Sequence, residues 1–431
     1  TCVHSTQKQI RDSFGKILTA AEEHIERAAF RIARTVDTRH EPGSVLTVVN
    51  PYPKMRLATI ELDTFKQPHG REEIVGFEDT DGTQYPVQWT QADANFGPWG
   101  LPWAKMTATL PVPACGHQTF KVLMANTGEA FENPFSGEEN AATEQFRKTE
   151  RSASRVIKGE VVPAFATLKT ALGTNLLAGS PKFLIIDDPS STWGHGVKAY
   201  NRILAELEFT SVEKIISGEV LSVTRHRAGW DQSEMLLDVR EHHVSGLIEL
   251  HLRFNWQQQR QMLKLAFPTT LENTATVALN TGSIVCRPAD GSEYPCHDWV
   301  ALKGELNGET SWLAVANDST YAFSSKDGQL AFTLARGVPY AEHPPFEYKD
   351  TTDLPFLDQG WQEKRFWLQA DSGDWQAHRI SGWAQEVQIP VVAILDSGHH
   401  GYRPYHGSLL EVDTDAVLVH AFVPGKNGNA H

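Results

Sequence analysis

The sequence predicts a mainly β protein: one long helix at the N-terminus, then a small β-sandwich, then a large antiparallel β-sandwich. Apolar residues recur at spacings of three and four through the first 35 residues, and from about residue 43 the period changes to two. No βαβ alternation follows, so a parallel sheet is not expected. The predicted divisions are a helical segment at 1–40, a small β-sandwich at 41–128, a polar insertion or linker at 129–160 and the large sandwich at 161–431.

The first segment predicts an amphipathic helix with one apolar stripe. The stripe is formed by Ile10, Phe14, Ile17, Leu18, Ala21, Ile25, Ala28, Ala29 and Ile32. A lone helix has too little to pack such a stripe against, so we expect the helix to belong to a helical bundle.

The next segments predict the strands of a small β-sandwich of roughly 85 residues. They are "SVLTVVNPYP", "RLATIELDTF" and "KMTATLPVPACGHQTFKVLM", which Pro and Gly interrupt. Residues 129–160 are polar and poorly patterned, which indicates a surface insertion and a domain boundary.

The rest of the chain predicts one large antiparallel assembly. In "LIELHLRFNW" (247–256) apolar side chains occupy every second position, whereas Glu249, His251, Arg253 and Asn255 occupy the others. This pattern is typical of a strand with one buried face. "QMLKLAFP", "SWLAVAND", "QLAFTLARG" and "EVQIPVVAIL" continue it, separated by turn sequences such as "ADGS" and "LNGE".

Composition limits the class of partner. The chain has 431 residues, with 39 basic and 53 acidic side chains and a formal charge of −14, which argues against nucleic acid. No apolar stretch is long enough to span a membrane, so no membrane partner is expected. Four scattered cysteines favour a reducing compartment, and we expect a cytoplasmic location. A disulfide between Cys286 and Cys296, bridging a hairpin, is the less favoured alternative.

Two groups of side chains could carry chemistry, and each has a simpler explanation. "DSGHHGYRPYHG" contains His399, His400 and His406, which would bind a metal only if a carboxylate such as Asp396 converged with them. The loop before residue 361 contains Asp350, Asp353 and Asp358. Paired carboxylates are what glycosidases use, but acidic loops are also ordinary solvated surface.

The stretch "DDPSSTWGHGVKAY" (187–200) follows an apolar run and holds His195 between two glycines. Such glycines permit positive φ or a close approach of the backbone to a ligand. Either a binding loop or a tight turn would explain them.

The order of motifs resembles glycoside hydrolase family 38, the α-mannosidases, and most closely their bacterial branch. The series is "FLIIDDPSSTWGHGVKAY", "IELHLRFNWQQQRQMLKLAFP", "GSIVCRPADGSEYPCHDWVAL", "WLAVANDSTYAFSSKDGQLAFTLARGVPYAEHPP" and "FLDQGWQEKRFWL". The resemblance covers about residues 165–425 and is weaker at 43–125. One departure is that the family's Leu-x-Pro-His reads Leu368-Gln369-Ala370-Asp371 here, which puts a role for a His there in doubt.

The resemblance implies an upstream α/β catalytic domain, a three-helix bundle, a small β domain and a large supersandwich of the galactose-mutarotase-like kind. The first residues of the chain look like the segment just after the family's His-His-Asp-x-x-Thr-Gly run, and its last residues look like a stretch that the family continues. We therefore expect both ends to be cut and the missing N-terminal catalytic domain to be a partner.

For function, the resemblance implies retaining, zinc-dependent hydrolysis of terminal α-mannosidic bonds in a mannose-containing oligosaccharide or glycoside. The family's His-x-Asp pair, nucleophilic Asp and closing His all map upstream of residue 1. We therefore expect zinc in the full-length enzyme but no catalytic residue, metal ligand or cofactor in this chain. The alternative is a non-catalytic carbohydrate-binding or structural β module. Assembly into a homo-oligomer is left open.

The resemblance also implies that loops of the large β domain approach the catalytic face. The candidates for a substrate rim are Arg287, Glu293, Asp318, Tyr321, Arg336, Trp193 and His195. For the first two, an ion pair that stabilises a hairpin is an equally good explanation. For Trp193 and His195, a turn at the edge of the large sandwich is the favoured one.

Overall fold

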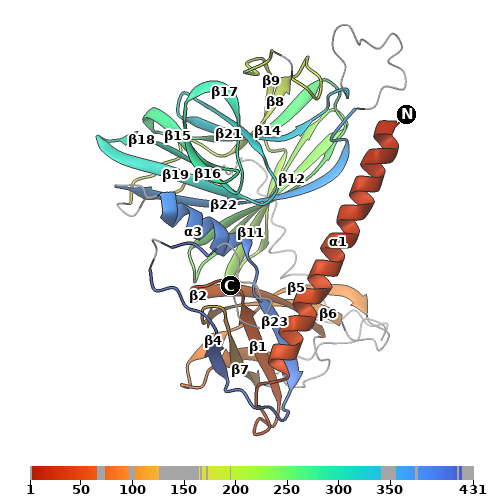
Figure 1. Ribbon diagram of the computed structural model, residues 1–431, viewed down its shortest axis with the longest axis vertical. Helices are drawn as coiled ribbons and strands as arrows, with labels where there is room; N and C mark the ends of the chain where they lie inside the picture. The colour runs from red at the N-terminus through yellow and green to blue at the C-terminus, as the bar shows by residue number, and fades with distance from the viewer. Residues whose placement is uncertain are drawn as a thin grey trace, which may run out of the picture.

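The computed structural model describes residues 2–65, 73–96, 102–125, 165, 167–170, 173–194, 196–340, 356–373, 377–414 and 417–419. The predicted fold class is confirmed: one long N-terminal helix is followed by antiparallel β-sheets that form a small and a large sandwich (Figure 1). The predicted insertion at 129–160 lies outside these residues.

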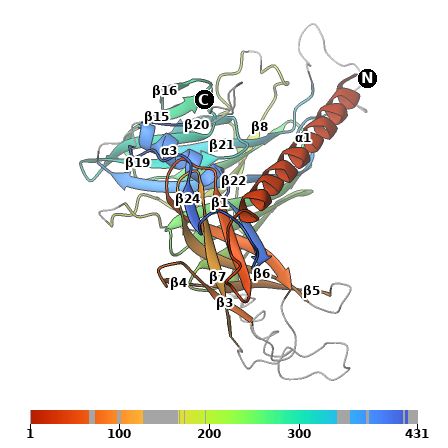
Figure 2. The ribbon, with the colours of Figure 1, turned by 60° about the horizontal axis from the view of Figure 1, so that its bottom comes forward.

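The N-terminal helix α1 (Cys2–Ala33) is present as predicted, but only its C-terminal end is covered. Ala29 and Ala33 are buried there, next to the small sandwich. Ile32 is half-buried, but the stripe before Ala28 is open: the exposed fractions of Ile10, Phe14 and Leu18 lie between 48% and 62%. In Figures 1 and 2 the helix extends from the small sandwich along one side of the large one. The bundle stays a prediction.

Two sheets form the small sandwich. The strands of the first sheet are, in order, β23 (Val392–Ser397), β1 (Ser44–Asn50), β7 (Gly116–Ala125), β3 (Glu73–Glu78) and β4 (Gln84–Pro86), with β24 (His406–Ser408) also paired to β7. The second sheet consists of β2 (Arg56–Phe65), β6 (Pro102–Val112) and β5 (Gln88–Phe96). Their facing sides bury one apolar core that includes Leu46, Ile60, Phe77, Met106 and Phe120.

One pairing differs from the predicted division of the chain. Strands β23 and β24 lie within the range 161–431 that was assigned to the large sandwich, yet both belong to the first sheet of the small sandwich. The ion pair between Arg34 and Asp396, 3.0 Å apart, fixes β23 against the end of α1. Alternation along a strand shows which of its faces is buried but not which sheet it joins, so sequence could not predict this return.

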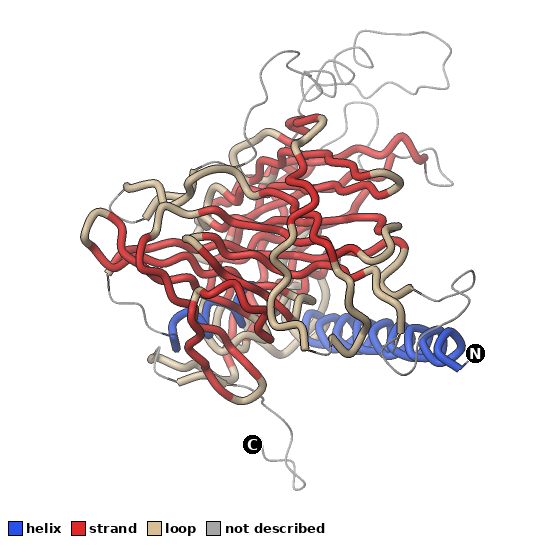
Figure 3. Tube along the Cα trace, turned by 90° about the horizontal axis from the view of Figure 1, so that it is seen from above, coloured by secondary structure: helices blue, strands red, loops and turns tan. Residues whose placement is uncertain are grey.

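The large sandwich packs a nine-stranded sheet on a six-stranded one, and the layers are visible from above in Figure 3. The first sheet has the order β10 (Ser211–Ile216), β11 (Leu221–Trp230), β12 (Ser233–His242), β13 (Leu247–Trp256), β22 (Gly360–Ser372), β19 (Glu309–Asn317), β18 (Trp299–Leu306), β15 (Glu272–Asn280) and β16 (Ser283–Pro288). The second has the order β17 (Asp290–Pro295), β20 (Ala322–Lys326), β21 (Gln329–Arg336), β14 (Gln261–Pro268), β8 (Lys182–Asp187) and β9 (Ile203–Leu207).

Strand β13 has the alternation that the sequence predicts. Leu250, Leu252, Phe254 and Trp256 are fully buried in the core between the two sheets. The intervening side chains lie on the opposite face, where His251 pairs with Glu363 of β22 at 2.7 Å. The hydrophobic core and the sheet register are therefore set by the same period-two pattern.

A second helix, α3 (Ala377–Gln388), was not predicted. It buries Ile380 and Ala384 against three tryptophans on the outer face of the nine-stranded sheet: Trp299, Trp312 and Trp367. The Trp299 indole N–H donates to Ser381 Oγ at 3.1 Å. The predicted strand "EVQIPVVAIL" therefore begins only at Val392, because its first residues belong to this helix.

Replacing a core residue of β13 should lower the free energy of unfolding far more than replacing the next residue along the strand, which lies on the opposite face. We expect Phe254→Ala to lower the free energy of unfolding of the large sandwich by about 3–5 kcal/mol, because it leaves a cavity between the sheets. Asn255→Ala, on the opposite face, should change it by less than about 0.5 kcal/mol. Urea unfolding followed by circular dichroism measures both, and equal effects would contradict the proposed core.

Candidate functional site

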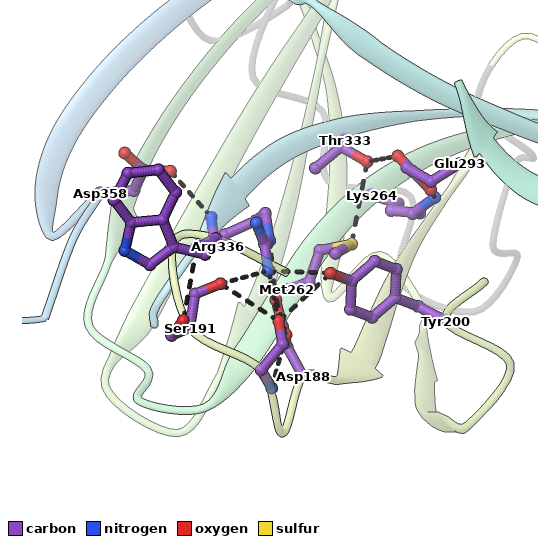
Figure 4. A network of polar contacts seen from close by, with 11 residues as sticks. Asp188, Ser191, Tyr200, Met262, Lys264, Glu293, Thr333, Arg336 and Asp358 are labelled. Carbon is purple, nitrogen blue, oxygen red and sulfur yellow. Dashed lines mark hydrogen bonds and ion pairs between the residues drawn. The ribbon is translucent and has the colours of Figure 1, made fainter. Parts of the chain in front are cut away.

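A buried ion pair joins the end of β8 to the end of β21. Asp188, which directly follows β8, is fully buried, and Arg336 is the last residue of β21. Arg336 Nε lies 2.8 Å from one carboxylate oxygen of Asp188, and Nη2 lies 3.2 Å from the other. This two-point contact fixes the plane of the guanidinium group (Figure 4).

The chain after Asp188 folds back over Arg336. Nη2 of Arg336 lies 2.6 Å from Ser190 Oγ and 2.9 Å from the Tyr200 hydroxyl, and the guanidinium carbon lies 5.3 Å from the centre of the Tyr200 ring. The backbone N–H of Arg336 donates to Asp358 at 2.9 Å. Burial lowers the pKa of Arg336, but the hydrogen bonds and charge of Asp188 outweigh it, and the pKa lies above its usual value.

The glycines near these residues have structural reasons. A Cβ atom on Gly337 would lie 1.8 Å from the carbonyl oxygen of Gln258, so only glycine fits directly after Arg336. Gly194 and Gly196 have φ of 56° and 74°, and Val197 N–H donates to the Gly194 carbonyl at 3.1 Å. Two tight turns thus explain the glycines of the motif at 187–200.

A second charged pair lies next to the first. Lys264 of β14 is 3% exposed; its ammonium group bonds to the Glu293 carboxylate and donates to Ser324 Oγ at 2.7 Å. The Thr333 hydroxyl donates to the other oxygen of Glu293. The Glu293 backbone N–H donates to the Lys198 carbonyl at 2.8 Å, which ties the chain after Asp188 to β17. We call the side chains of Asp188, Ser190, Tyr200, Lys264, Glu293, Thr333 and Arg336 the polar network.

The polar network is electrically balanced, with two cations and two carboxylates. Both oxygens of each carboxylate accept hydrogen bonds: those of Asp188 from Arg336 and from Ser190 Oγ at 2.5 Å, and those of Glu293 from Lys264 and Thr333. A carboxylate held in this way is a poor nucleophile or general base. The arrangement is suited to fixing polar groups for contact with a ligand rather than to bond cleavage.

The predicted rim residues are divided among different places. Arg336 and Glu293 belong to the polar network. Trp193 belongs to the loop that follows Asp188, and its exposed fraction is 60%. Arg287 and Glu293 do not pair: the guanidinium carbon of Arg287 lies 5.1 Å from the ring centre of Tyr294, whereas Glu293 binds Lys264.

The other candidates lie at the β19–β20 connection or cannot be placed. Asp318 accepts hydrogen bonds from the Arg365 backbone N–H at 3.0 Å and from its neighbour Ser319. Tyr321 is 62% exposed and meets the His297 ring edge-on at 5.7 Å. His195 lies outside the described residues.

Sequence reasoning missed Asp188, Tyr200 and Lys264. A signal existed for the last of these, because Lys264 is the only charge within the apolar run "QMLKLAFP" and a buried ammonium group needs a partner. The Asp358 carboxylate accepts a hydrogen bond from the backbone N–H of Arg336. Asp350 and Asp353, from the same predicted acidic loop, lie outside the described residues.

The metal and disulfide alternatives are not supported where the structure describes the chain. His399 Nε2 lies 3.2 Å from the Ala33 carbonyl and its backbone N–H donates to Thr38, so it ties the C-terminal loop to α1. No group of three or more His, Cys, Asp or Glu side chains that could hold a metal occurs among the described residues. Cys286 and Cys296 are both free, and burial raises the pKa of Cys296 to about 12.

Neither of the two described helices is long and apolar enough to cross a membrane.

Substituting Arg336, whose partner Asp188 is buried, should destabilise the large sandwich more than substituting Arg202, whose partner Asp187 lies at the surface. Arg336→Lys loses the two-point contact and leaves the Asp188 carboxylate buried with an incomplete partner, which we expect to cost about 2–4 kcal/mol of unfolding free energy. Arg202 pairs with Asp187 at 3.3 Å on the surface, and Arg202→Lys should cost less than about 0.5 kcal/mol. Urea unfolding measures both free energies. An equally small loss for Arg336→Lys and Arg202→Lys would show that the buried pair does not contribute to the stability of the large sandwich.

Comparisons with known proteins give the relationship. The family model described as the glycosyl hydrolases family 38 C-terminal domain matches residues 181–344. A solved structure of an α-mannosidase from Enterococcus faecalis V583 superposes with a TM-score of 0.64 at 14% identity, covering 93% of this chain and 52% of that one. A second, of a family 38 glycosyl hydrolase protein from Enterococcus faecalis, gives a TM-score of 0.58 at 14% identity, covering 89% and 51%.

The chain thus spans about half the length of the solved structures that it resembles. A search of curated protein sequences found no match. At this level of identity the structural likeness establishes the fold alone. Residues 181–344, which contain the polar network, match the model of the glycosyl hydrolases family 38 C-terminal domain.

Proposed function

We propose that this chain is the helical and β portion of an α-mannosidase that hydrolyses terminal α-mannosidic bonds with retention and with zinc. The observation that carries the proposal is the match of residues 181–344 to the family 38 C-terminal domain. The shared fold with an α-mannosidase from Enterococcus faecalis over 93% of the chain supports it. The substrate would be a mannose-containing oligosaccharide or glycoside.

In this proposal the catalytic groups belong to a partner domain upstream in the full enzyme. The zinc ion that the family implies does not fit the described residues, since none of their His, Cys, Asp and Glu side chains form a group that could hold it. A nucleophilic carboxylate must also be free to attack, and both carboxylates of the polar network are engaged by a cationic side chain. The chain then contributes scaffold and part of the substrate rim.

The open stripe of α1 supports an upstream partner. Four large side chains, Ile10, Phe14, Ile17 and Leu18, follow one another at helical spacing and are each about half exposed or more. Covering a side chain of this size stabilises a protein by about 1.5–3 kcal/mol, so an exposed row of them favours a packed neighbour. We propose that the upstream domain, through further helices, covers this stripe.

The loop of the polar network is our strongest candidate for the rim. The exposed indole of Trp193 offers a face for stacking on a sugar ring, and Asp188 and Tyr200 fix the guanidinium group of Arg336. In Figures 1 and 2 the N-terminal half of α1 and strand β8 lie toward the same end of the molecule. A domain seated on α1 would therefore be on the side from which it could approach this loop.

A non-catalytic carbohydrate-binding module is the second candidate function. Exposed aromatic side chains favour it, because Trp193, Tyr321 and Trp361 all have exposed fractions of 60% or more. Such a module would bind sugar without any upstream domain. A cytoplasmic location, supported by the free thiols of Cys286 and Cys296, and assembly into a homo-oligomer remain proposals.

An activity assay separates the two functions. We expect the isolated 431-residue chain not to hydrolyse an aryl α-mannoside, with or without added zinc. A chain extended by the upstream sequence of its gene should hydrolyse it, and chelation should abolish that activity. Zinc-dependent turnover by the isolated chain would contradict the placement of the catalytic groups. An extended chain without activity that still binds mannosides would favour the binding module.

A further inference from the structure

A cleft lies where the two sandwiches meet, and its residues are separate from the polar network. Its volume is about 470 Å³, within the range of small-molecule sites, and its walls come from β2 of the small sandwich, β13 and β22 of the large one, and α3. In Figure 1, α3 lies between the nine-stranded sheet and β2. None of the residues that line the cleft belongs to the polar network.

The walls of the cleft contain buried side-chain nitrogen atoms that have no hydrogen-bond partner among the described residues. Arg56 is 9% exposed; its Nη1 donates to the Glu386 carbonyl oxygen, but its Nε and Nη2 are unpartnered. His242 is 6% exposed; its Nε2 lies 3.3 Å from Glu249, but its Nδ1 is unpartnered. Each unsatisfied buried polar group costs about 1–3 kcal/mol, so the wall would be stabilised by a hydrogen-bonding occupant.

The charges around the cleft exclude a strongly charged occupant. Glu61, Glu249 and Glu386 line the walls together with Arg56 and Arg365. Arg240, which does not line the cleft, is bound to Glu61 and lies 3.3 Å from Glu249, so the three carboxylates are balanced by two guanidinium groups in the walls and a third beside them. The carboxylates would repel an anion and the arginines would repel a cation, whereas a neutral ligand is repelled by neither.

Two tryptophans complete the walls. Trp367 of β22 and Trp383 of α3 both line the cleft, near the carboxylate and guanidinium groups. Aromatic faces beside planar groups that donate or accept hydrogen bonds suit a ring that carries hydroxyl groups. Each hydroxyl can accept from an arginine and donate to a carboxylate at once.

We propose that this cleft is a binding site for a neutral sugar unit, separate from the substrate rim at the polar network. All of the residues that line the cleft belong to the described part of this chain. It would give the protein a second contact with an oligosaccharide, or with a different one.

The test uses the intact 431-residue chain and saturation-transfer NMR with titration calorimetry. The neutral probes are methyl α-D-mannopyranoside and methyl β-D-glucopyranoside, and the anionic probes are D-glucuronate and inorganic phosphate. The cleft variants are Glu386→Gln and Arg365→Gln, which change one group each at the surface of the walls. Glu309→Gln, an exposed glutamate at the start of β19, is the matched control, and Arg336→Lys reports on the rim.

We expect at least one neutral probe to bind and each cleft variant to raise its Kd about tenfold, because each removes a charged hydrogen-bonding group. Glu309→Gln and Arg336→Lys should leave this Kd within about twofold. An unchanged melting temperature shows that a cleft variant is folded. Loss of binding in Arg336→Lys alone would contradict sugar binding in the cleft and would support sugar binding at the rim. No binding of either neutral probe, or tighter binding of an anionic probe, would also overturn it.

Discussion

The buried carboxylate of Asp188 is the constraint around which the outer face of the six-stranded sheet is organised. A carboxylate without solvent contact is stable only with a partner of opposite charge and a full set of hydrogen bonds. Arg336 provides both, and in doing so it fixes the ends of β8 and β21 to each other. The chain that follows Asp188 can close over this pair because Ser190 and Tyr200 also bind the same guanidinium group.

A second set of polar contacts decides how the two sandwiches meet. Gln88 of β5 accepts from the backbone N–H groups of Val220 and Leu221 at 2.9 Å each, and Arg240 of β12 pairs with Glu61 of β2. Together with the return of β23 to the first sheet, these contacts hold the small sandwich against the end of the large one. The joint is polar and incompletely packed, and the cleft lined by Arg56 and His242 is the consequence.

The sequence predicted the parts of the fold that depend on local periodicity. The helix over residues 2–33 follows from apolar residues at spacings of three and four, and the buried face of β13 follows from apolar residues at every second position. The destination of β23 and the existence of α3 could not be predicted, because each depends on contacts between residues that lie far apart in the chain. In α3, for example, Ile380 is buried in a cluster with Trp299 of β18, Trp312 of β19 and Trp367 of β22.

The candidate site was predicted in part for the same reason. The motif at 187–200 contains three residues of the polar network, and Arg336 and Glu293 also belong to it, whereas their contact with a substrate stays a prediction. Their partners were not foreseen: an Arg287–Glu293 pair fits the spacing of a hairpin, but Lys264 on another strand takes the glutamate instead. Pairing across strands depends on sheet order, which residue types do not encode.

The central claim is that the Arg336–Asp188 pair holds the loop of the rim in place, and amide hydrogen exchange tests it most directly. The relevant reporters are Gly194 and Val197, whose N–H groups donate within the turns at 3.0 and 3.1 Å, with Leu265 of β14 as the reference. In Arg336→Gln we expect the two loop amides to lose at least about tenfold in protection through local opening of the loop, whereas the protection of Leu265 falls only as far as the global unfolding free energy does. Unchanged protection of Gly194 and Val197 in that variant would contradict the account.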